Sequence, residues 1–285
     1  MAGASTMPLE LIQRLERHRD FHFRRTRDRR VKSESEALKF ISEVGFCTAF
    51  TAGLEVPCLR EAIVGEREPP LPHRIQHDHA IGMTWRLKDV LTARGAVYYG
   101  KAIAGRPAFI APRMLPAFLR LRVDRASYLT AFRRGNLSLC AKQIMDALRR
   151  RRLATTRQLK FTSGCERPSR RAEFDRAIKE LQQKFLILKI EERYEPFTYV
   201  WSTMDYRWSD AMAQARSLRP LQAAYDVIKN YFLIAGYGNQ RKIASVLGIE
   251  PELTRKAITR LIREGLVTDG STRDLYALSE KHLHA

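Results

Sequence analysis

Residues 239–267 read NQRKIASVLGIEPELTRKAITRLIREGLV, and this stretch decides the fold. Its first part is a short amphipathic helix that starts after Asn239 and ends at Gly248, and Pro251 opens a second helix. The chain then enters a strand at Leu266 and turns through Asp269-Gly270 toward a return strand. Together with an amphipathic helix at 221–234, this order of helix, turn, helix and hairpin predicts a winged helix-turn-helix.

The second helix of this stretch has a copy 80 positions earlier in the chain. Residues 176–181 (RAIKEL) align with residues 256–261 (KAITRL), and a two-residue apolar run follows each at the same spacing. The earlier copy includes a helix at 137–148, a short helix at 157–160 and a hairpin of 186–190 and 197–201, and we expect Ser169 to cap its repeated helix. Because the same helical unit occurs twice, we expect the chain to be built from tandem copies of it.

A more divergent third copy precedes these two. Ser35 precedes a helix that Gly45 ends, short helices follow at 57–63 and 85–91, and strands at 96–99 and 108–110 form a hairpin. The sequence therefore predicts a mainly α protein with small β-hairpin wings, built from three tandem winged helix-turn-helix units. We place a basic N-terminal arm at 1–33 and the three units at 34–122, 123–208 and 209–285.

The charge balance points to a polyanionic partner. Lys and Arg number 51 against 31 Asp and Glu, for a formal net charge of +20. Neutralising phosphates releases condensed counterions, which favours a nucleic acid partner. Within the arm, Pro8 opens a helix, and Phe21 and Phe23 lie among arginines. This pattern suits either a solvated face or an arm that contacts DNA.

The remaining composition fits a cytoplasmic, nucleoid-associated protein. The four cysteines are scattered without the spacing of a zinc or redox site, as expected in a reducing compartment. No apolar run approaches the length that crosses a membrane. His73, His77, Asp78 and His79 lie close together but match no zinc pattern, so we expect no metal and no cofactor.

Helical periodicity separates a buried face from an outward face on each repeated helix. In the later copy, Leu253, Ala257, Ile258, Leu261 and Ile262 fall on the inner side, as do Ala177, Ile178 and Leu181 in the earlier one. The outward residues are predicted to meet the major groove, and they are Arg255, Lys256, Thr259 and Arg263, with Arg176, Lys179 and Gln183 at matching positions.

Further cations, beyond the outward residues of these two helices, are also predicted to contact DNA, by their phosphates or in the minor groove where they lie in the wings. They are Arg149, Arg150, Arg151, Arg152, Arg170, Arg171 and Arg241, with Lys101, Arg106 and Arg273 in the wings.

The chain resembles the AlkZ/YcaQ-type winged-helix family, in particular its AlkZ-related branch. The resemblance rests on Trp85-Arg86-Leu87-Lys88-Asp89, Val97-Tyr98-Tyr99-Gly100-Lys101 and Gly105-Arg106-Pro107, and would cover roughly residues 34 to 280. The family includes bacterial DNA glycosylases, which use a Gln-x-Gln or Gln-x-Asp pair soon after the first helix of the first unit. Here that place reads Phe46-Cys47-Thr48-Ala49.

A Gln-x-Asp does occur further on, at Gln76-His77-Asp78. Under the resemblance, Gln76 and Asp78 are the candidate catalytic residues: an amide and a carboxylate could position water and stabilise an oxocarbenium ion at an extruded nucleotide. A chance occurrence of the pattern is the competing interpretation.

Three hypotheses for function follow from the sequence. The first is binding of double-stranded DNA without catalysis, in regulation or repair. The second is a DNA glycosylase acting on alkylated or crosslinked DNA. The third is a protein–protein scaffold, since winged helices also serve as docking modules.

Overall fold

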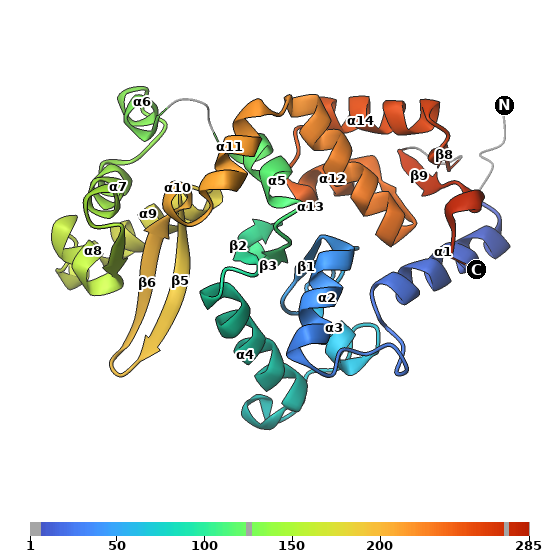
Figure 1. The fold of residues 1–285 in the computed structure, drawn as a ribbon, viewed down its shortest axis with the longest axis horizontal. Helices are drawn as coiled ribbons and strands as arrows, with labels where there is room; N and C mark the ends of the chain where they lie inside the picture. The colour runs from blue at the N-terminus through green and yellow to red at the C-terminus, as the bar shows by residue number, and fades with distance from the viewer. Residues whose placement is uncertain (1–6, 124–126, 271–273, 285) are drawn as a thin grey trace.

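The same order of elements (helix, strand, helix, helix, strand, strand) occurs three times in the computed structural model, which describes residues 7–123, 127–270 and 274–284 (Figure 1). The first repeat comprises α2 (Glu34–Val44), β1 (Phe46–Thr48), α3 (Leu59–Val64), α4 (His79–Ala93), β2 (Tyr98–Ile103) and β3 (Arg106–Ile110). The second comprises α7 (Leu139–Arg151), β4 (Leu153–Thr155), α8 (Thr156–Thr162), α9 (Arg171–Gln183), β5 (Ile187–Tyr194) and β6 (Phe197–Thr203). The third comprises α12 (Pro220–Ala235), β7 (Tyr237–Asn239), α13 (Gln240–Leu247), α14 (Pro251–Arg263), β8 (Val267–Asp269) and β9 (Leu275–Leu278).

The other elements precede, connect or follow the repeats. They are the helices α1 (Leu9–His22), α5 (Leu115–Arg122), α6 (Tyr128–Arg133), α10 (Met204–Arg207) and α11 (Ser209–Ser217), and the 3-10 turns η1 (Ile75–His77), η2 (Pro168–Arg170) and η3 (Glu280–His282). The protein is therefore mainly helical with small sheets, as the sequence predicts. No helix among the described residues has the length and apolarity to cross a bilayer.

Each repeat contains one three-stranded antiparallel sheet with the same strand order. The sheets run β1-β3-β2, β4-β6-β5 and β7-β9-β8, so the short first strand always pairs with the third. Phe46 lies opposite Ile110, Ala154 opposite Trp201, and Tyr237 opposite Ala277. The sequence analysis finds the hairpins but not these first strands, which are three residues long and pair with residues far away in the chain.

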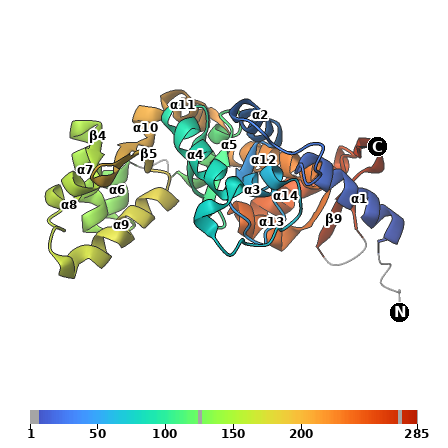
Figure 2. The same ribbon diagram turned by 90° about the horizontal axis from the view of Figure 1, so that it is seen from below.

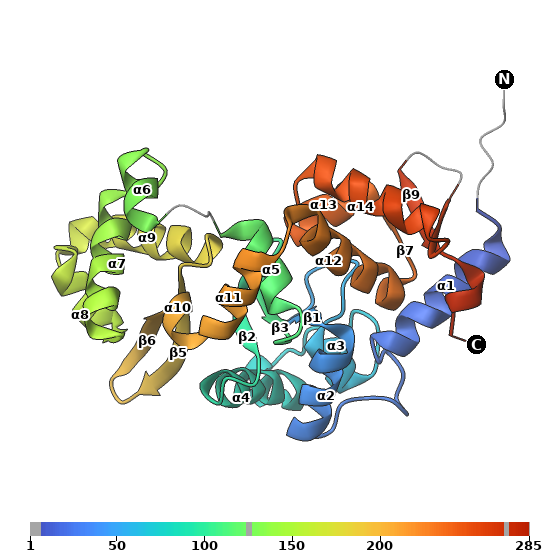
Figure 3. The same ribbon diagram turned by 45° about the horizontal axis from the view of Figure 1, so that its top comes forward.

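The repeats are divided between two hydrophobic cores. The first and third repeats, with α1, α5 and α11, share one core, whereas α7, α8, α9 and their sheet bury a separate core. Hydrogen bonds join the first and third repeats: the Ala104 amide donates to the Val246 carbonyl (2.8 Å), and the Asn230 amide to the Val44 carbonyl (2.8 Å). The second repeat accordingly lies at one end of the molecule (Figures 2 and 3).

Helix starts follow capping chemistry, and two of the caps differ from the expected ones. The cap of α2 is Ser33, not Ser35, and it accepts a bond from the Glu36 amide. The helix α9 follows η2 with Arg170 as its N-cap residue, so Ser169 is not the cap. Glu250, a residue type seldom used as a cap, accepts from the Leu253 amide at the start of α14.

Replacing Thr155 with Ala is expected to destabilise the second repeat by about 1 kcal/mol, the usual cost of losing an N-cap. The Thr155 hydroxyl accepts from the Gln158 amide, and the Gln158 side chain accepts from the Thr155 amide, which is a complete capping box. Ser169→Ala, in η2 of the same repeat, is the control and should change the free energy of unfolding by less than about 0.5 kcal/mol. Urea denaturation compares the two, and equal effects would contradict the assignment.

The basic arm packs against the third repeat. The Arg19 guanidinium is buried and donates to the carbonyls of Ala235 and Tyr237 (2.8 Å each), and His18 contacts the Leu233 carbonyl. Arg25, also buried, pairs with Glu61 at 2.7 Å. The expectation that the arm contacts DNA is therefore wrong for these cations, because their charges are already satisfied inside the protein.

The stability of the protein should fall as pH drops from 7 to 5, and His22 on α1 should contribute about 1 kcal/mol of that fall. Burial, with His18, His284 and Arg29 nearby, lowers the pKa of His22 to about 4. An unfolded histidine titrates near 6.5, so between these values the unfolded state binds more protons. The contribution is present above pH 6.5 and is lost as pH falls toward 4. Urea midpoints of His22→Gln should depend less on pH, and parallel curves would exclude His22 as the cause.

Candidate nucleic-acid interface

The outward face of α14 is exposed and cationic, as predicted. Arg255, Lys256, Thr259 and Arg263 are all exposed. Ala257, Ile258 and Leu261 are buried, but Ile262 is 39% exposed, so its placement on the inner side is wrong. Thr254 takes the inner position instead, because its hydroxyl is satisfied by the Glu250 carbonyl at 3.1 Å. Glu252 pairs with Arg255 and Lys256, so part of the positive charge is balanced within the helix.

The helix α9 of the second repeat presents a corresponding face. Arg176, Lys179 and Gln183 are exposed, while Ala177 and Leu181 are buried. Ile178 is half-buried and lines a cavity. The periodicity of the sequence thus finds the outer faces of both repeated helices.

Most of the remaining predicted DNA-contacting cations are exposed. They are Arg149, Arg150 and Arg151 at the end of α7, the following Arg152, Arg171 and Arg241, and Lys101 and Arg106 on the first hairpin. Arg170 is half-buried and donates to both Glu173 carboxylate oxygens and to the Gly164 carbonyl, each at 2.8 Å, which makes it less available to DNA. Arg273 lies outside the described residues.

Gln76 and Asp78 directly precede α4, and Asp78 is not among the residues that line the cavity between the first two repeats. Gln76 is in the turn η1, and Asp78 caps α4 through a 2.7 Å bond from the Ile81 amide. Lys88, which belongs to the charge cluster described below, is ten residues further along this helix, or about 15 Å. Asp78 therefore has a structural role at the helix start, and a catalytic role for the pair stays a hypothesis.

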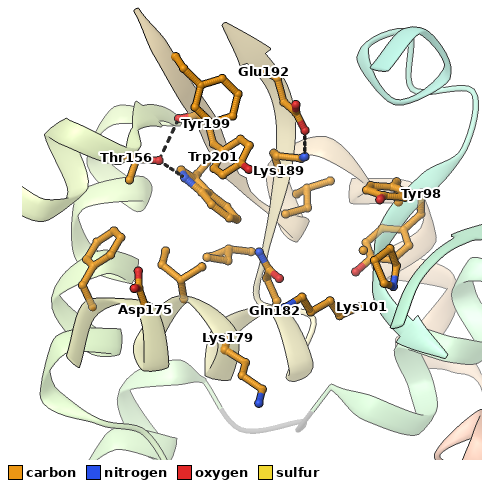
Figure 4. Close-up of a pocket in the computed structure, with 18 of the residues that line it drawn as sticks. Tyr98, Lys101, Thr156, Asp175, Lys179, Gln182, Lys189, Glu192, Tyr199 and Trp201 are labelled. Carbon is orange, nitrogen blue, oxygen red and sulfur yellow. Dashed lines mark hydrogen bonds and ion pairs between the residues drawn. The ribbon is translucent and has the colours of Figure 1, made fainter. Parts of the chain in front are cut away.

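An aromatic cavity of about 530 Å³ opens between the first and second repeats (Figure 4). Lys101 from β2 and Lys179 from α9, both predicted DNA contacts, belong to its lining. Trp201 is fixed by its indole N–H, which donates to Thr156 at 3.0 Å. The wall of the cavity carries seven aromatic side chains: Trp85, Tyr98, Tyr99, Phe174, Phe197, Tyr199 and Trp201. The cavity is as large as sites that bind small organic molecules.

Gly100 allows the first repeat to close one wall of this cavity. An added Cβ there would lie 2.3 Å from the hydroxyl oxygen of Tyr98, whose ring stacks on Phe185 at a centroid distance of 5.1 Å. Any larger residue would push the Tyr98 ring from its place. The Tyr-Tyr-Gly-Lys sequence thus determines the position of an aromatic wall.

Two lysines share one carboxylate beside the aromatic rings. Glu192 Oε1 accepts from Lys88 Nζ at 2.5 Å and from Lys189 Nζ, and Lys88 also pairs with Asp89 at 3.0 Å. Lys88 is 2% exposed, and Lys189 lies over the Tyr199 ring at 4.6 Å. Figure 4 shows the Lys189 amine against Glu192 at the cavity wall.

A β-bulge in β5 places Lys189 and Glu192 on the same face of the sheet. Lys189 lies opposite Trp201, Glu191 opposite Val200 and Glu192 opposite Tyr199, with a register shift between Lys189 and Glu191. In a regular strand, residues three apart point to opposite faces. The extra residue moves Glu192 to the face of Lys189, Tyr199 and Trp201.

The cluster gives its members different proton affinities. Burial lowers the pKa of Lys189, and the charge of Lys88 lowers it further, although Glu192 acts in the other direction. The pKa of Lys88 is raised: burial opposes the shift, but bonds to Glu192 and Asp89 outweigh it. The pKa of Glu192 is lowered by the two lysines against the effect of burial. Lys189 is therefore the member of the pair that gives up its proton more easily.

Two cysteines that are far apart in sequence meet in the second core. The sulfur atoms of Cys140 and Cys165 are 3.4 Å apart, and a Glu173 carboxylate oxygen lies within 4.8 Å of both. Burial raises the pKa of Cys140 to about 12, and Arg170 already binds both oxygens of Glu173. The Cys140 thiol is thus held neutral, and the group resembles core packing more than a metal centre.

The sequence does not predict the cluster of Lys88, Lys189 and Glu192 or the aromatic cavity; Trp85, Lys88, Tyr98 and Tyr99 enter only through the motifs that resemble the family. The residues come from α4, β2, α9 and the β5–β6 hairpin, and Lys88 and Glu192 are 104 positions apart. An alternating strand pattern assigns Lys189 and Glu192 to opposite faces. A lysine directly after the apolar run Leu186-Ile187-Leu188 is the one signal that could have indicated a partly buried amine.

Comparison with known proteins identifies relatives of the fold. Residues 31–247 match the protein family described as AlkZ related. No curated protein sequence matches the chain. Among solved structures, the DNA glycosylase AlkZ of Streptomyces sahachiroi superposes with a TM-score of 0.58 at 16% sequence identity, and the alignment covers 94% of this chain and 70% of that one. At this identity, the likeness establishes the shared fold.

Proposed function

We propose, since the chain belongs to the AlkZ-related family of AlkZ/YcaQ-type proteins, that it binds double-stranded DNA through tandem winged helices. The observation that carries this proposal is the pair of exposed faces on α9 and α14. Both are the third helix of their repeat, and both present exposed cations on the outer face, with Arg176 and Lys256 at one matching position. The name of the structural relative, a DNA glycosylase, is consistent with a DNA partner.

We infer that each repeat is a winged-helix unit. The element order and the first-third-second strand order are those expected when a helix-turn-helix precedes a β-hairpin wing. We keep the unit boundaries at 34–122, 123–208 and 209–285, with residues 1–33 as an arm whose helix α1 packs on the third unit. The first and third units then act as one body because they share a core.

The helices α9 and α14 would lie in the major groove, where arginine binds guanine in bidentate fashion. Arg149, Arg150, Arg151 and Arg152 would contact phosphates beside α9. Lys101 and Arg106 on the hairpin of the first unit would contact the backbone, and Arg241 would do so near α14.

We propose binding without base excision. The positions of the family's Gln-x-Gln or Gln-x-Asp pair are occupied by Phe46, Cys47, Thr48 and Ala49, all at most 1% exposed. A residue so buried cannot position water at a nucleotide. Glycosylase activity through Gln76 and Asp78 remains the alternative, and abasic sites formed from alkylated DNA would support it, provided that Asp78→Ala abolishes them.

The test of the proposed function is duplex binding across a salt series, by fluorescence anisotropy. Affinity should fall linearly with the logarithm of salt concentration, with a slope of about −0.9 per phosphate neutralised. No binding at low salt, or binding indifferent to salt, would refute DNA recognition and favour the protein–protein scaffold.

A further inference from the structure

The aromatic cavity contains an amine arranged for covalent chemistry. Lys189 lies over Tyr199 (4.6 Å) and near Tyr99 (5.7 Å), and its side chain is 18% exposed at the cavity wall. Amines react with carbonyls only when neutral, and proteins achieve this by desolvating a lysine or placing it beside another cation. Both conditions hold here, because Lys189 is largely buried beside the Tyr99 and Tyr199 rings and the Lys88 ammonium shares the Glu192 carboxylate with it.

We propose that Lys189 forms an imine with an aldehyde, and that this aldehyde is the ring-opened deoxyribose of an abasic site in duplex DNA. The identification of the aldehyde rests on the proposed DNA binding. Two exposed lysines among the cavity residues, Lys101 and Lys179, are candidates for the flanking phosphates. An abasic residue has lost its base pair, so its sugar leaves the stack at a low cost.

The reaction is balanced without an oxidant or a metal. Lys189 releases its proton to water in the cavity while Glu192 stays ionised beside Lys88, and the amine nitrogen attacks the aldehyde carbon. The carbonyl oxygen leaves as one molecule of water, and a carbon–nitrogen double bond replaces the carbon–oxygen double bond. Addition of water reverses the step and restores Lys189. The groups that face the amine are Lys88 and Asp89 from α4, Glu192 from β5, Tyr99 from β2 and Tyr199 from β6.

The first experiment traps the imine. The full-length protein is incubated with a duplex containing one abasic site, sodium cyanoborohydride reduces any imine, and the adduct is mapped by mass spectrometry. We expect the adduct at Lys189, a loss of at least tenfold in Lys189→Arg, and no change in Lys39→Arg, a surface lysine on α2. An adduct mapped to Lys101 or Lys179, or undiminished trapping in Lys189→Arg, would overturn the proposal. Circular dichroism and a second variant, Lys189→Met, verify that loss of trapping is not loss of folding.

The second experiment tests the reactivity of the Lys189 amine in the absence of DNA. Benzaldehyde and cyanoborohydride replace the abasic duplex, and the modified lysines are ranked by mass spectrometry at several pH values. Lys189 should be alkylated ahead of the surface lysines, with a midpoint below the ordinary lysine value of about 10.4; equal or slower modification would overturn the assignment of a reactive amine. If Lys189 reacts with benzaldehyde but not with an abasic duplex that the protein binds, abasic DNA is excluded as the substrate while the proposed function stands. If the protein binds neither intact nor abasic duplex, the proposed function fails, and the assignment of abasic DNA fails with it.

Discussion

The double variant Lys256→Glu/Arg263→Glu is expected to bind duplex DNA at least about 30-fold more weakly than the parent protein. Each base or phosphate interaction of such a side chain contributes about 1–3 kcal/mol, and removing two of them gives this factor at the lower limit. Both residues are exposed on the outer face of α14, away from its buried side. Anisotropy titrations should also show the salt slope reduced by about 2 in magnitude, one for each phosphate that is no longer neutralised.

A matched control distinguishes the contacts made by the outer face of α14 from the long-range attraction of the net positive charge. Lys39→Glu/Arg94→Glu produces the same change in net charge at two exposed positions, 71% and 66% accessible, on α2 and at the end of α4. Its affinity should fall much less, because long-range attraction is screened over about 10 Å at ordinary salt. Equal losses in both variants would show that charge alone drives binding. No loss in either would favour docking to a protein.

Local periodicity explains why the sequence is sufficient to find the helix faces. The residues of α9 and α14 alternate between core and solvent with a period set by the helix itself, so neighbours in sequence decide which side chains point outward. Ile262 is the exception, since Thr254 fills the inner position through a bond to its own helix. The hairpins are found for the same reason: glycines and short apolar runs determine them locally.

The features that the sequence does not predict depend on contacts between residues far apart in the chain. The strands β1, β4 and β7 become strands only because β3, β6 and β9 supply their partners. The buried Arg19 cannot be distinguished from a solvated cation until the Ala235 carbonyl is placed beside it. The cavity requires both the bulge in β5 and the packing of the first repeat against the second. The charged cluster at its wall joins α4 to β5, two elements that no sequence window spans.

The variant Glu192→Leu is expected to lower the free energy of unfolding by about 3–5 kcal/mol, the cost of removing one partner from a buried ion pair. Lys88 is 2% exposed and would keep Asp89 as its carboxylate partner, while Lys189 would lose the carboxylate that it shares. Glu191→Leu is the matched control, because Glu191 is exposed and pairs with Arg193 on the surface. Its effect should stay below about 1 kcal/mol, as for most surface ion pairs. Equal urea midpoints for the two variants would show that the cluster adds nothing to stability.

A double variant distinguishes an unpaired charge from poorer packing as the cause of that instability. In Lys189→Met/Glu192→Leu the ammonium that loses its carboxylate is removed with it, and the methionine can take the place of the lysine beside the Tyr199 ring. If the cost of Glu192→Leu comes from the stranded ammonium, the double variant should be more stable than Glu192→Leu alone. If packing is the cause, the second substitution should add to the loss. Coupling of the two sites in a double-mutant cycle, at about 1 kcal/mol or more, would therefore establish that the charges act as one unit.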